Sequence, residues 1–271
     1  MNCPYCPHHC ALKEGQAGLC GARKNLSGRS VPVQPYLISS LALDPVEKKP
    51  LYHFYPGKSI LSVGGYGCNM ACYFCQNHEI SMARGHQAGR TLPPEELCAL
   101  AEGLKPRGNI GGAFTYNEPM VNFEYIAETG ALLKQAGLKT AVITNGCFTQ
   151  EALQRVLPVV DAFNIDLKGF TADWYRKLGG DLETVKAFIA AAQQQAHVEV
   201  TTLIVPGKND SEEEMDAQAR WLASLSPDIP LHISRYFPRF KANEAATPRE
   251  KVLALQKIAQ RHLKNVYTGN M

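Results

Sequence analysis

The sequence predicts an α/β fold, an incomplete (β/α)6 barrel that follows a small cysteine-rich N-terminal lobe. Six apolar segments typical of buried strands alternate with amphipathic stretches typical of helices. This alternation favours a parallel sheet with right-handed crossovers. Six such units are two fewer than a complete eightfold barrel contains. A chain of 271 residues is long enough for one such domain with a small appendage.

We expect three regions along the chain. A cysteine-rich metal-binding lobe occupies 1–25, an extended segment wrapping the barrel occupies 26–58, and the partial barrel occupies 59–271. Prolines and short β-like pieces mark the second region as extended rather than helical. The barrel strands are predicted at 59–65, 110–116, 138–144, 159–166, 198–205 and 229–234. The helices are predicted at 94–104, 120–136, 149–157, 182–195, 211–225 and 248–263.

Composition excludes several classes of protein. Hydrophobic residues make up 45% and charged residues 20% of the chain, as in a globular protein with a substantial core. No run of 18 apolar residues is long enough to span a membrane. The net charge is only +3 without a dense basic run, so nucleic acid binding is unsupported. The polar N-terminus does not look like a signal peptide, and we expect a cytoplasmic protein.

Seven of the nine cysteines fall into two tight groups, which indicates metal binding in a reducing compartment. One group is Cys68, Cys72 and Cys75, spaced C-x3-C-x2-C directly after the first barrel strand. Soft thiolates select iron–sulfur clusters, zinc or Cu(I). A four-iron cluster held by three thiolates keeps one iron open to another ligand. The alternative is a structural zinc knuckle, but no fitting fourth ligand lies between Cys75 and Cys98.

The other group forms the N-terminal lobe and has the spacing C-x2-C-x3-C-x9-C. A lobe of about 25 residues is too small for hydrophobic burial alone to stabilise its fold, so we expect a bound metal to stabilise it. Zinc or a second iron–sulfur cluster would suit four thiolates, and uncommitted thiols are the alternative. The four predicted ligands are Cys3, Cys6, Cys10 and Cys20.

Polar side chains follow the predicted strands where the chemistry of parallel α/β folds is located, at the carboxyl ends. Alternation puts three of them on one face of the fourth strand, which is costly inside a barrel unless a ligand is present. Simpler structural roles are the alternatives for these residues: a helix cap for Glu118, an Asn-Gly turn at Asn145, an ion pair between Asp166 and Lys168, and a packed, hydrogen-bonded His232. The candidate cofactor-binding residues are Glu118, Thr144, Asn145, Asn164, Asp166, Lys168, His232 and Arg235.

The cysteine loop, with an aromatic residue before its last cysteine, resembles that of the radical S-adenosylmethionine (radical SAM) superfamily. The resemblance implies a [4Fe-4S] cluster whose open iron is chelated by the amino and carboxylate groups of S-adenosylmethionine. An electron from a flavodoxin- or ferredoxin-type donor would then release a 5′-deoxyadenosyl radical that abstracts a hydrogen atom. It also implies that Glu118 receives the amino group, that Lys168 binds the carboxylate and that Asp166 binds ribose or ammonium. Arg235 would bind the cofactor carboxylate or an anionic substrate.

Over nearly its full length the chain resembles the radical SAM component of the AmmeMemoRadiSam system, a branch near the pyruvate formate-lyase activases. The substrate stays unassigned, and no side chain is assigned to the hydrogen transfer. One alternative function is a glycyl radical enzyme activase, which would act on a glycine of a protein substrate. The other is a non-catalytic iron–sulfur electron carrier or a zinc-held interaction module.

Overall fold

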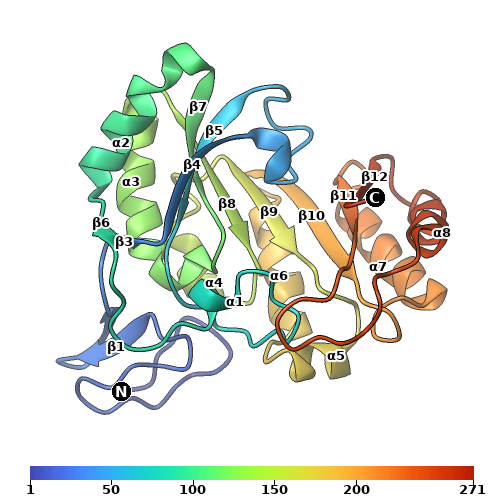
Figure 1. Cartoon of the computed structure of the whole chain (residues 1–271), viewed down its shortest axis with the longest axis horizontal. Helices are drawn as coiled ribbons and strands as arrows, with labels where there is room; N and C mark the ends of the chain where they lie inside the picture. Colours follow the sequence, from blue (N-terminus) through green and yellow to red (C-terminus); the bar gives the residue numbers. More distant parts are fainter.

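The computed structural model describes residues 1–271 and centres on an eight-stranded sheet (Figure 1). The strand order is β12-β11-β10-β9-β8-β7-β5-β4, and all neighbours are parallel except β4 and β5. The predicted α/β partial barrel is therefore confirmed. The strands are β4 (Ser40–Pro45), β5 (Ser59–Gly64), β7 (Asn109–Phe114), β8 (Lys139–Thr144), β9 (Ala162–Asp166), β10 (His197–Ile204), β11 (Leu231–Arg235) and β12 (Val266–Gly269).

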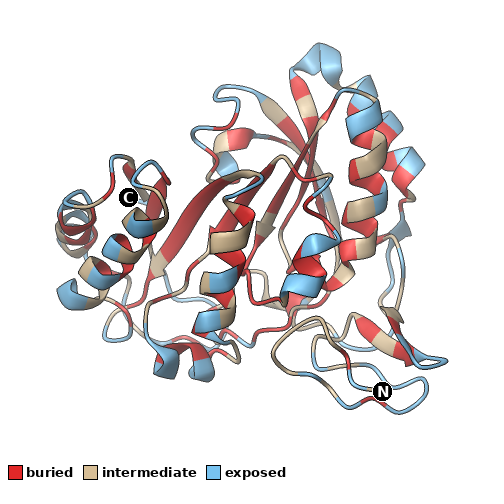
Figure 2. Cartoon of the chain, turned by 180° about the vertical axis from the view of Figure 1, so that it is seen from behind, coloured by how far each residue is buried: buried red, intermediate tan, exposed pale blue.

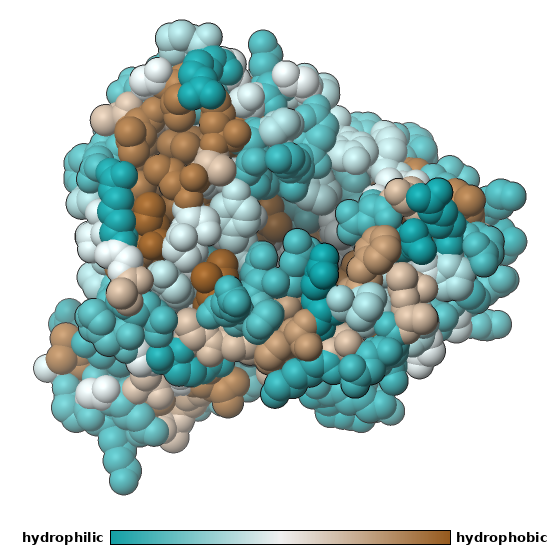
Figure 3. Space-filling model, in the orientation of Figure 1, coloured by the Kyte–Doolittle hydropathy of each residue, from teal (hydrophilic) through white to brown (hydrophobic).

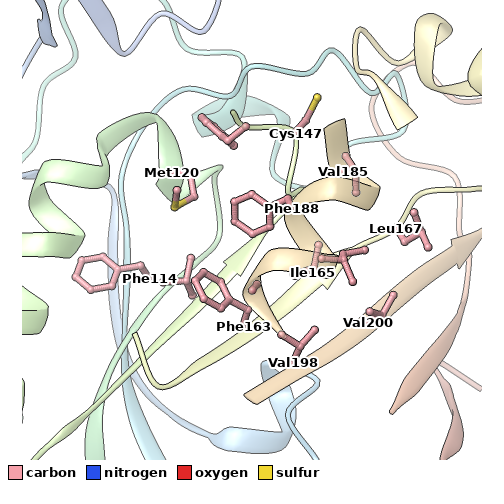
Figure 4. Packing of buried hydrophobic residues seen from close by; sticks show 14 of the residues in the cluster. Phe114, Met120, Cys147, Phe163, Ile165, Leu167, Val185, Phe188, Val198 and Val200 are labelled. Carbon is pink, nitrogen blue, oxygen red and sulfur yellow. The ribbon is translucent and has the colours of Figure 1, made fainter. Parts of the chain in front are cut away.

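Helices connect the parallel strands and bury one side against the sheet, while their outer sides are exposed (Figure 2). Phe163 of β9 and Phe188 of the helix at 182–192 pack edge to face within this core, with 5.7 Å between their ring centroids (Figure 4). Asp181 begins that helix by accepting a hydrogen bond from the Thr184 N–H. The helices are α1 (His78–Ser81), α2 (Pro94–Gly103), α3 (Phe123–Gln135), α4 (Gln150–Gln154), α5 (Ala172–Lys177), α6 (Leu182–Ala192), α7 (Glu212–Leu225) and α8 (Arg249–Ala259).

The sheet has two edge strands that the sequence pattern did not predict. β4 lies in the proline-rich region and pairs antiparallel with β5, and β12 extends the sheet beyond β11. The connection from β4 to β5 contains only a short 3₁₀ helix, Val46–Lys48, and no α-helix that could cover the outer side of β4. A hydrophobic area is therefore visible over β4 and α2, where Leu41 and Leu100 are exposed (Figure 3). None of the helices combines the length and apolar character needed to cross a membrane.

Residues 46–54 close the barrel at the end where the parallel strands begin. Leu51 and Phe54 pack there against small side chains of the strands, including Ala141 and Ala162. Glu199, near the start of β10, accepts hydrogen bonds from the backbone N–H groups of Tyr52 and His53 at 3.0 and 2.7 Å. Glu199 also bonds His197 and His232, so a buried polar network fixes this closing segment.

The N-terminal lobe lies at the opposite end, beside the carboxyl ends of the strands (Figure 1). A two-stranded hairpin, β1 (Arg23–Leu26) and β2 (Arg29–Pro32), crosses the predicted boundary between the lobe and the next region. The buried guanidinium of Arg23 binds both carboxylate oxygens of Glu124 on α3, at 2.6 and 2.7 Å. It also lies over the rings of Tyr5 and Phe123, at 4.7 and 4.6 Å from their centroids. The charge-assisted pair with Glu124 and the cation–π contact with Phe123 therefore hold the lobe against the barrel.

Candidate functional site

A cavity of about 700 Å³ opens at the carboxyl ends of β5 and β7–β11. This volume lies in the range of small-molecule sites. The three cysteines of the loop after β5 line it together with polar residues from the five other strands. The cavity therefore collects most of the predicted site. The predicted residues that line it are Cys68, Cys72, Cys75, Glu118, Thr144, Asn145, Asp166, Lys168 and Arg235.

The cysteine loop is fixed by bonds to its backbone and to one of its sulfurs. Gly67 has φ +90°, and a Cβ there would lie 2.6 Å from the Cys20 carbonyl oxygen, so glycine permits the close approach of lobe and loop. The Cys68 N–H donates to that same oxygen at 3.2 Å. The Cys68 sulfur lies 3.4 Å from the Met70 N–H and 3.7 Å from the Asn145 amide nitrogen. Hydrogen bonds to a sulfur of this kind tune the potential of an iron–sulfur cluster.

Burial raises the pKa of two of the loop thiols, to about 11 for Cys72 and well above the usual value for Cys68. Nearby Lys168 acts in the other direction on Cys72. In the metal-free protein these side chains are neutral thiols, and metal binding must release their protons. No three Cys, His, Asp or Glu side chains converge closely enough to hold a single metal ion. Thiolates that each bind a different iron need no such convergence, so the donor set fits a cluster better than one zinc ion.

Glu118 lies at the end of β7, and its carboxylate reaches across to β8. Its oxygens accept hydrogen bonds from the Thr144 hydroxyl and the Asn145 N–H, both at 2.7 Å, and from the Met120 N–H at 3.0 Å. Burial outweighs these bonds and raises the pKa of Glu118 to about 7. A cation placed in the cavity beside Glu118 would favour its ionised form.

Asp166 is the last residue of β9, Lys168 lies two positions after it, and their side chains form an ion pair with an N–O distance of 3.0 Å. Burial by itself lowers the pKa of Lys168, but nearby Asp166 and Cys72 raise it overall, so the ammonium group stays charged. The Lys168 backbone N–H donates to the buried Tyr175 hydroxyl at 3.0 Å. A fixed ammonium and a carboxylate therefore lie beside the Cys72 thiol.

The structure does not bring Asn164 and His232 into the cavity. The Asn164 amide donates to the Pro50 carbonyl oxygen at 2.8 Å and accepts from the Thr201 hydroxyl at 3.0 Å. His232 is 3% exposed and bonds Glu199 at 2.6 Å. Both side chains face the barrel interior as expected, but they contact the closing segment and its network rather than the open cavity.

A further polar group in the cavity wall was missed by the sequence reasoning. Lys49 pairs with Asp44 at 2.9 Å, and the Tyr116 hydroxyl donates to the same carboxylate at 2.8 Å. The Lys49 ammonium also lies 4.6 Å from the centroid of the Tyr116 ring. Tyr116 has φ +73°, a strained value for a residue with a side chain, and such strain gathers at functional sites. The sequence did carry a signal, because residues 49–57 (Lys-Pro-Leu-Tyr-His-Phe-Tyr-Pro-Gly) are unusually rich in proline and aromatic residues.

The four lobe cysteines line one small pocket of about 20 Å³. Burial raises the pKa of Cys6 to about 12 and also raises that of Cys20. The thiols are gathered, but no three of them converge as one tetrahedral zinc ion requires. The lobe is nevertheless joined to the cluster loop, because His8 Nε2 lies 2.7 Å from the Asn69 carbonyl oxygen.

The chain is similar in sequence to known relatives and in fold to solved structures. Along its whole length the chain is 38% identical to an uncharacterised protein of Methanocaldococcus jannaschii, of which it covers 81%. It is 26% identical to a putative glycyl-radical enzyme activating enzyme of the same organism, over 78% of this chain and 89% of that protein. A radical SAM methyltransferase from Sphaerobacter thermophilus has a similar fold, with a TM-score of 0.60 at 18% identity over 79% of this chain and 67% of that one.

The Radical SAM superfamily model matches residues 62–222, more than half of the chain. This stretch begins in β5 and includes the cysteine loop and the ends of β7, β8 and β9. Members of the superfamily are enzymes that use a [4Fe-4S] cluster and S-adenosylmethionine. The chain therefore belongs to the radical SAM superfamily.

Proposed function

We propose that this protein cleaves S-adenosylmethionine reductively and abstracts a hydrogen atom from a substrate held in the same cavity. The bound cluster and cofactor would supply the 5′-deoxyadenosyl radical. The observation that carries the proposal is the shared cavity, which places three thiols of one loop beside a buried carboxylate and a fixed ammonium group. A purely structural metal site would need neither the cavity nor these charges.

The three loop cysteines are the proposed ligands of the cluster, and their number supports a catalytic role. A carrier cluster is normally ligated fully by protein, whereas Cys68, Cys72 and Cys75 leave one iron free. The sulfur of Cys68 has two N–H groups within 3.7 Å, which would stabilise its thiolate. These features disfavour the non-catalytic electron carrier and the zinc-held interaction module.

The charged strand-end residues are the proposed binding groups for the methionine part of the cofactor. Glu118 suits the amino group because its oxygens are already oriented by Thr144 and Asn145. Lys168 suits the carboxylate, and Asp166 would orient the Lys168 ammonium and contact ribose or ammonium. In this arrangement the protein binds each charged end of the cofactor with the opposite charge.

A second candidate function is activation of a glycyl radical enzyme. It is supported by the relatives named as activating enzymes, which include a pyruvate formate-lyase-activating enzyme of Clostridium pasteurianum at 27% identity over 60% of this chain. An activase of this kind would take a hydrogen atom from a glycine of a protein partner. Transfer of the radical to a protein would distinguish it from small-molecule chemistry.

We further propose that Cys3, Cys6, Cys10 and Cys20 bind a second metal centre, either an iron–sulfur cluster or a zinc ion on which the thiols close when the metal binds. Their common pocket and the bonds between lobe and cluster loop support this proposal. Such a centre would stabilise the lobe and, through the Cys20 carbonyl, the backbone of Cys68.

The test of the main proposal is release of 5′-deoxyadenosine by the anaerobically reconstituted protein with S-adenosylmethionine and dithionite. We expect the wild type to form the nucleoside and Cys72→Ala to form none. Cys98→Ala is the matched control, because Cys98 is a buried thiol of α2 that does not line the cavity. Absence of the nucleoside in the wild type, with a full complement of iron, would contradict the proposal.

A further inference from the structure

The cavity extends beyond the residues assigned above to the cluster and the cofactor. Those residues come from the loop after β5 and from β7, β8 and β9. No group of the cluster or of the cofactor has been assigned to the wall formed by β10, β11 and the segment after β11. It consists of Thr201, Leu203, Ser234, Arg235, Phe237 and Arg239.

Arg235 is the most strongly oriented cation of this wall. Its Nε–H donates to the Thr247 carbonyl oxygen at 2.6 Å. Its guanidinium lies 4.7 Å from the centroid of the Phe237 ring. Thr247 is fully buried, and its hydroxyl donates to the Ile204 carbonyl oxygen at 2.6 Å, so the group that orients the arginine is itself fixed.

The terminal nitrogens of Arg235 have no partner within the protein. Its side chain makes only the hydrogen bond through Nε, and no carboxylate forms an ion pair with it. A guanidinium held at one edge presents the other edge as a fork of N–H donors. Such a fork matches two oxygens of a carboxylate or phosphate group. Arg235 is therefore oriented in advance for an anion.

The balance of charges in the cavity also favours binding of an anion. Five cationic side chains line it against two carboxylates. Lys168 is paired with Asp166 and Lys49 with Asp44, while Glu118 is placed for a cofactor ammonium. Lys48 also contacts Asp44, at 3.4 Å, so the two cations of the cavity without a carboxylate partner are Arg235 and Arg239, both on the β11 side. The seven residues are Lys48, Lys49, Lys168, Arg235, Arg239, Glu118 and Asp166.

We propose that the substrate carries an oxyanion, a carboxylate or a phosphate, and that Arg235 binds it through its free nitrogens. This inference rests on the proposed function, because it places the substrate in the cavity that would also hold the cofactor. Phe237 holds the guanidinium in place, and Arg239 adds positive charge at the same wall. Arg235 then serves the substrate rather than the cofactor carboxylate, for which Lys168 is already available.

The test uses the reconstituted holoenzyme saturated with S-adenosylmethionine, with inorganic phosphate and benzoate as probes. Binding is measured by anaerobic calorimetry, and benzamide serves as the neutral counterpart of benzoate. Arg235→Gln should weaken binding of the preferred oxyanion about 10- to 100-fold, as loss of a charged hydrogen bond predicts. Arg220→Gln, at an exposed arginine of α7 paired with Asp216, should leave binding unchanged. Whichever of the two probes binds more tightly shows whether the substrate carries a phosphate or a carboxylate.

A second measurement needs no substitution and so does not depend on how a variant folds. Phosphate or benzoate should protect Arg235 of the wild type from modification by phenylglyoxal, measured by peptide mass spectrometry. Binding of benzamide as tight as benzoate, no binding of either anion, or unprotected Arg235 would overturn the inference. If any of these three results is obtained while the wild type still releases 5′-deoxyadenosine, the role of Arg235 is wrong but the proposed function stands. If Arg235 binds the oxyanion but no nucleoside forms, the proposed function fails instead.

Discussion

Replacing Glu118 by glutamine should change how the stability of the metal-free protein depends on pH. The Glu118 carboxyl is 3% exposed, and its burial raises its pKa to about 7 from an ordinary value of 4.5. The three hydrogen bonds that it accepts act in the opposite direction but do not outweigh burial. The folded protein therefore binds this proton more tightly than the unfolded chain does.

The sign of the effect follows from this difference. Stabilisation by the protonated Glu118 is fully present below pH 4.5 and is lost as the pH rises through about 7. A pKa difference of this size corresponds to about 3 kcal/mol in the free energy of unfolding, most of it lost between pH 5 and 8. Glutamine cannot ionise, so it removes this pH dependence. Its amide would also face the Asn145 N–H, which adds a cost of about 1–3 kcal/mol at every pH.

Urea unfolding of the reduced, metal-free protein at pH 5 and pH 8 is the assay. Relative to Glu118→Gln, the wild type should lose about 2.5 kcal/mol between the two pH values. Glu213→Gln, at an exposed glutamate of α7, is the control and should follow the wild type. Parallel pH profiles for the wild type and Glu118→Gln would refute the reasoning. A profile of opposite sign would mean that the hydrogen bonds outweigh burial.

Two further predictions concern the metal centres and the cofactor. Cys3→Ser combined with Cys6→Ser should lower the zinc or iron content per chain while the loop cluster is retained, measured by elemental analysis; unchanged zinc and iron would mean that the lobe holds no metal. Lys168→Met should weaken S-adenosylmethionine binding about 10- to 100-fold with the iron content intact, measured by equilibrium dialysis. Unchanged affinity would remove Lys168 from the cofactor site.

The sequence predicted the six central strands because each is an apolar run followed by a polar end. It missed β4 because that strand lies in the proline-rich region and ends at Pro45, and it missed β12 because that strand has only four residues. It also missed that the segment at 46–54 closes the barrel, since that role depends on contacts with residues such as Glu199, more than 140 positions away. Pairing over such distances leaves no periodic pattern in the sequence.

For the site, the sequence predicted the face of a residue better than its depth. Alternation correctly put Asn164 on the inner face of β9, together with Asp166. A strand rises about 3.3 Å per residue, so Asn164 lies roughly 7 Å deeper than Asp166 and meets the closing segment. His232 is deeper than Arg235 on β11 for the same reason. The group of Lys49, Asp44 and Tyr116 was missed because it joins three segments that only the folded sheet brings together.

The most direct test of the central claim is electron paramagnetic resonance of the reduced, reconstituted protein before and after addition of S-adenosylmethionine. A cluster held by Cys68, Cys72 and Cys75 keeps one iron free, so the cofactor should bind that iron and change the signal of a [4Fe-4S]⁺ centre. Cys98→Ala should behave as the wild type does. The account would be contradicted by a spectrum that does not change when S-adenosylmethionine is added. It would also be contradicted if protein with intact Cys68, Cys72 and Cys75 contained no four-iron cluster.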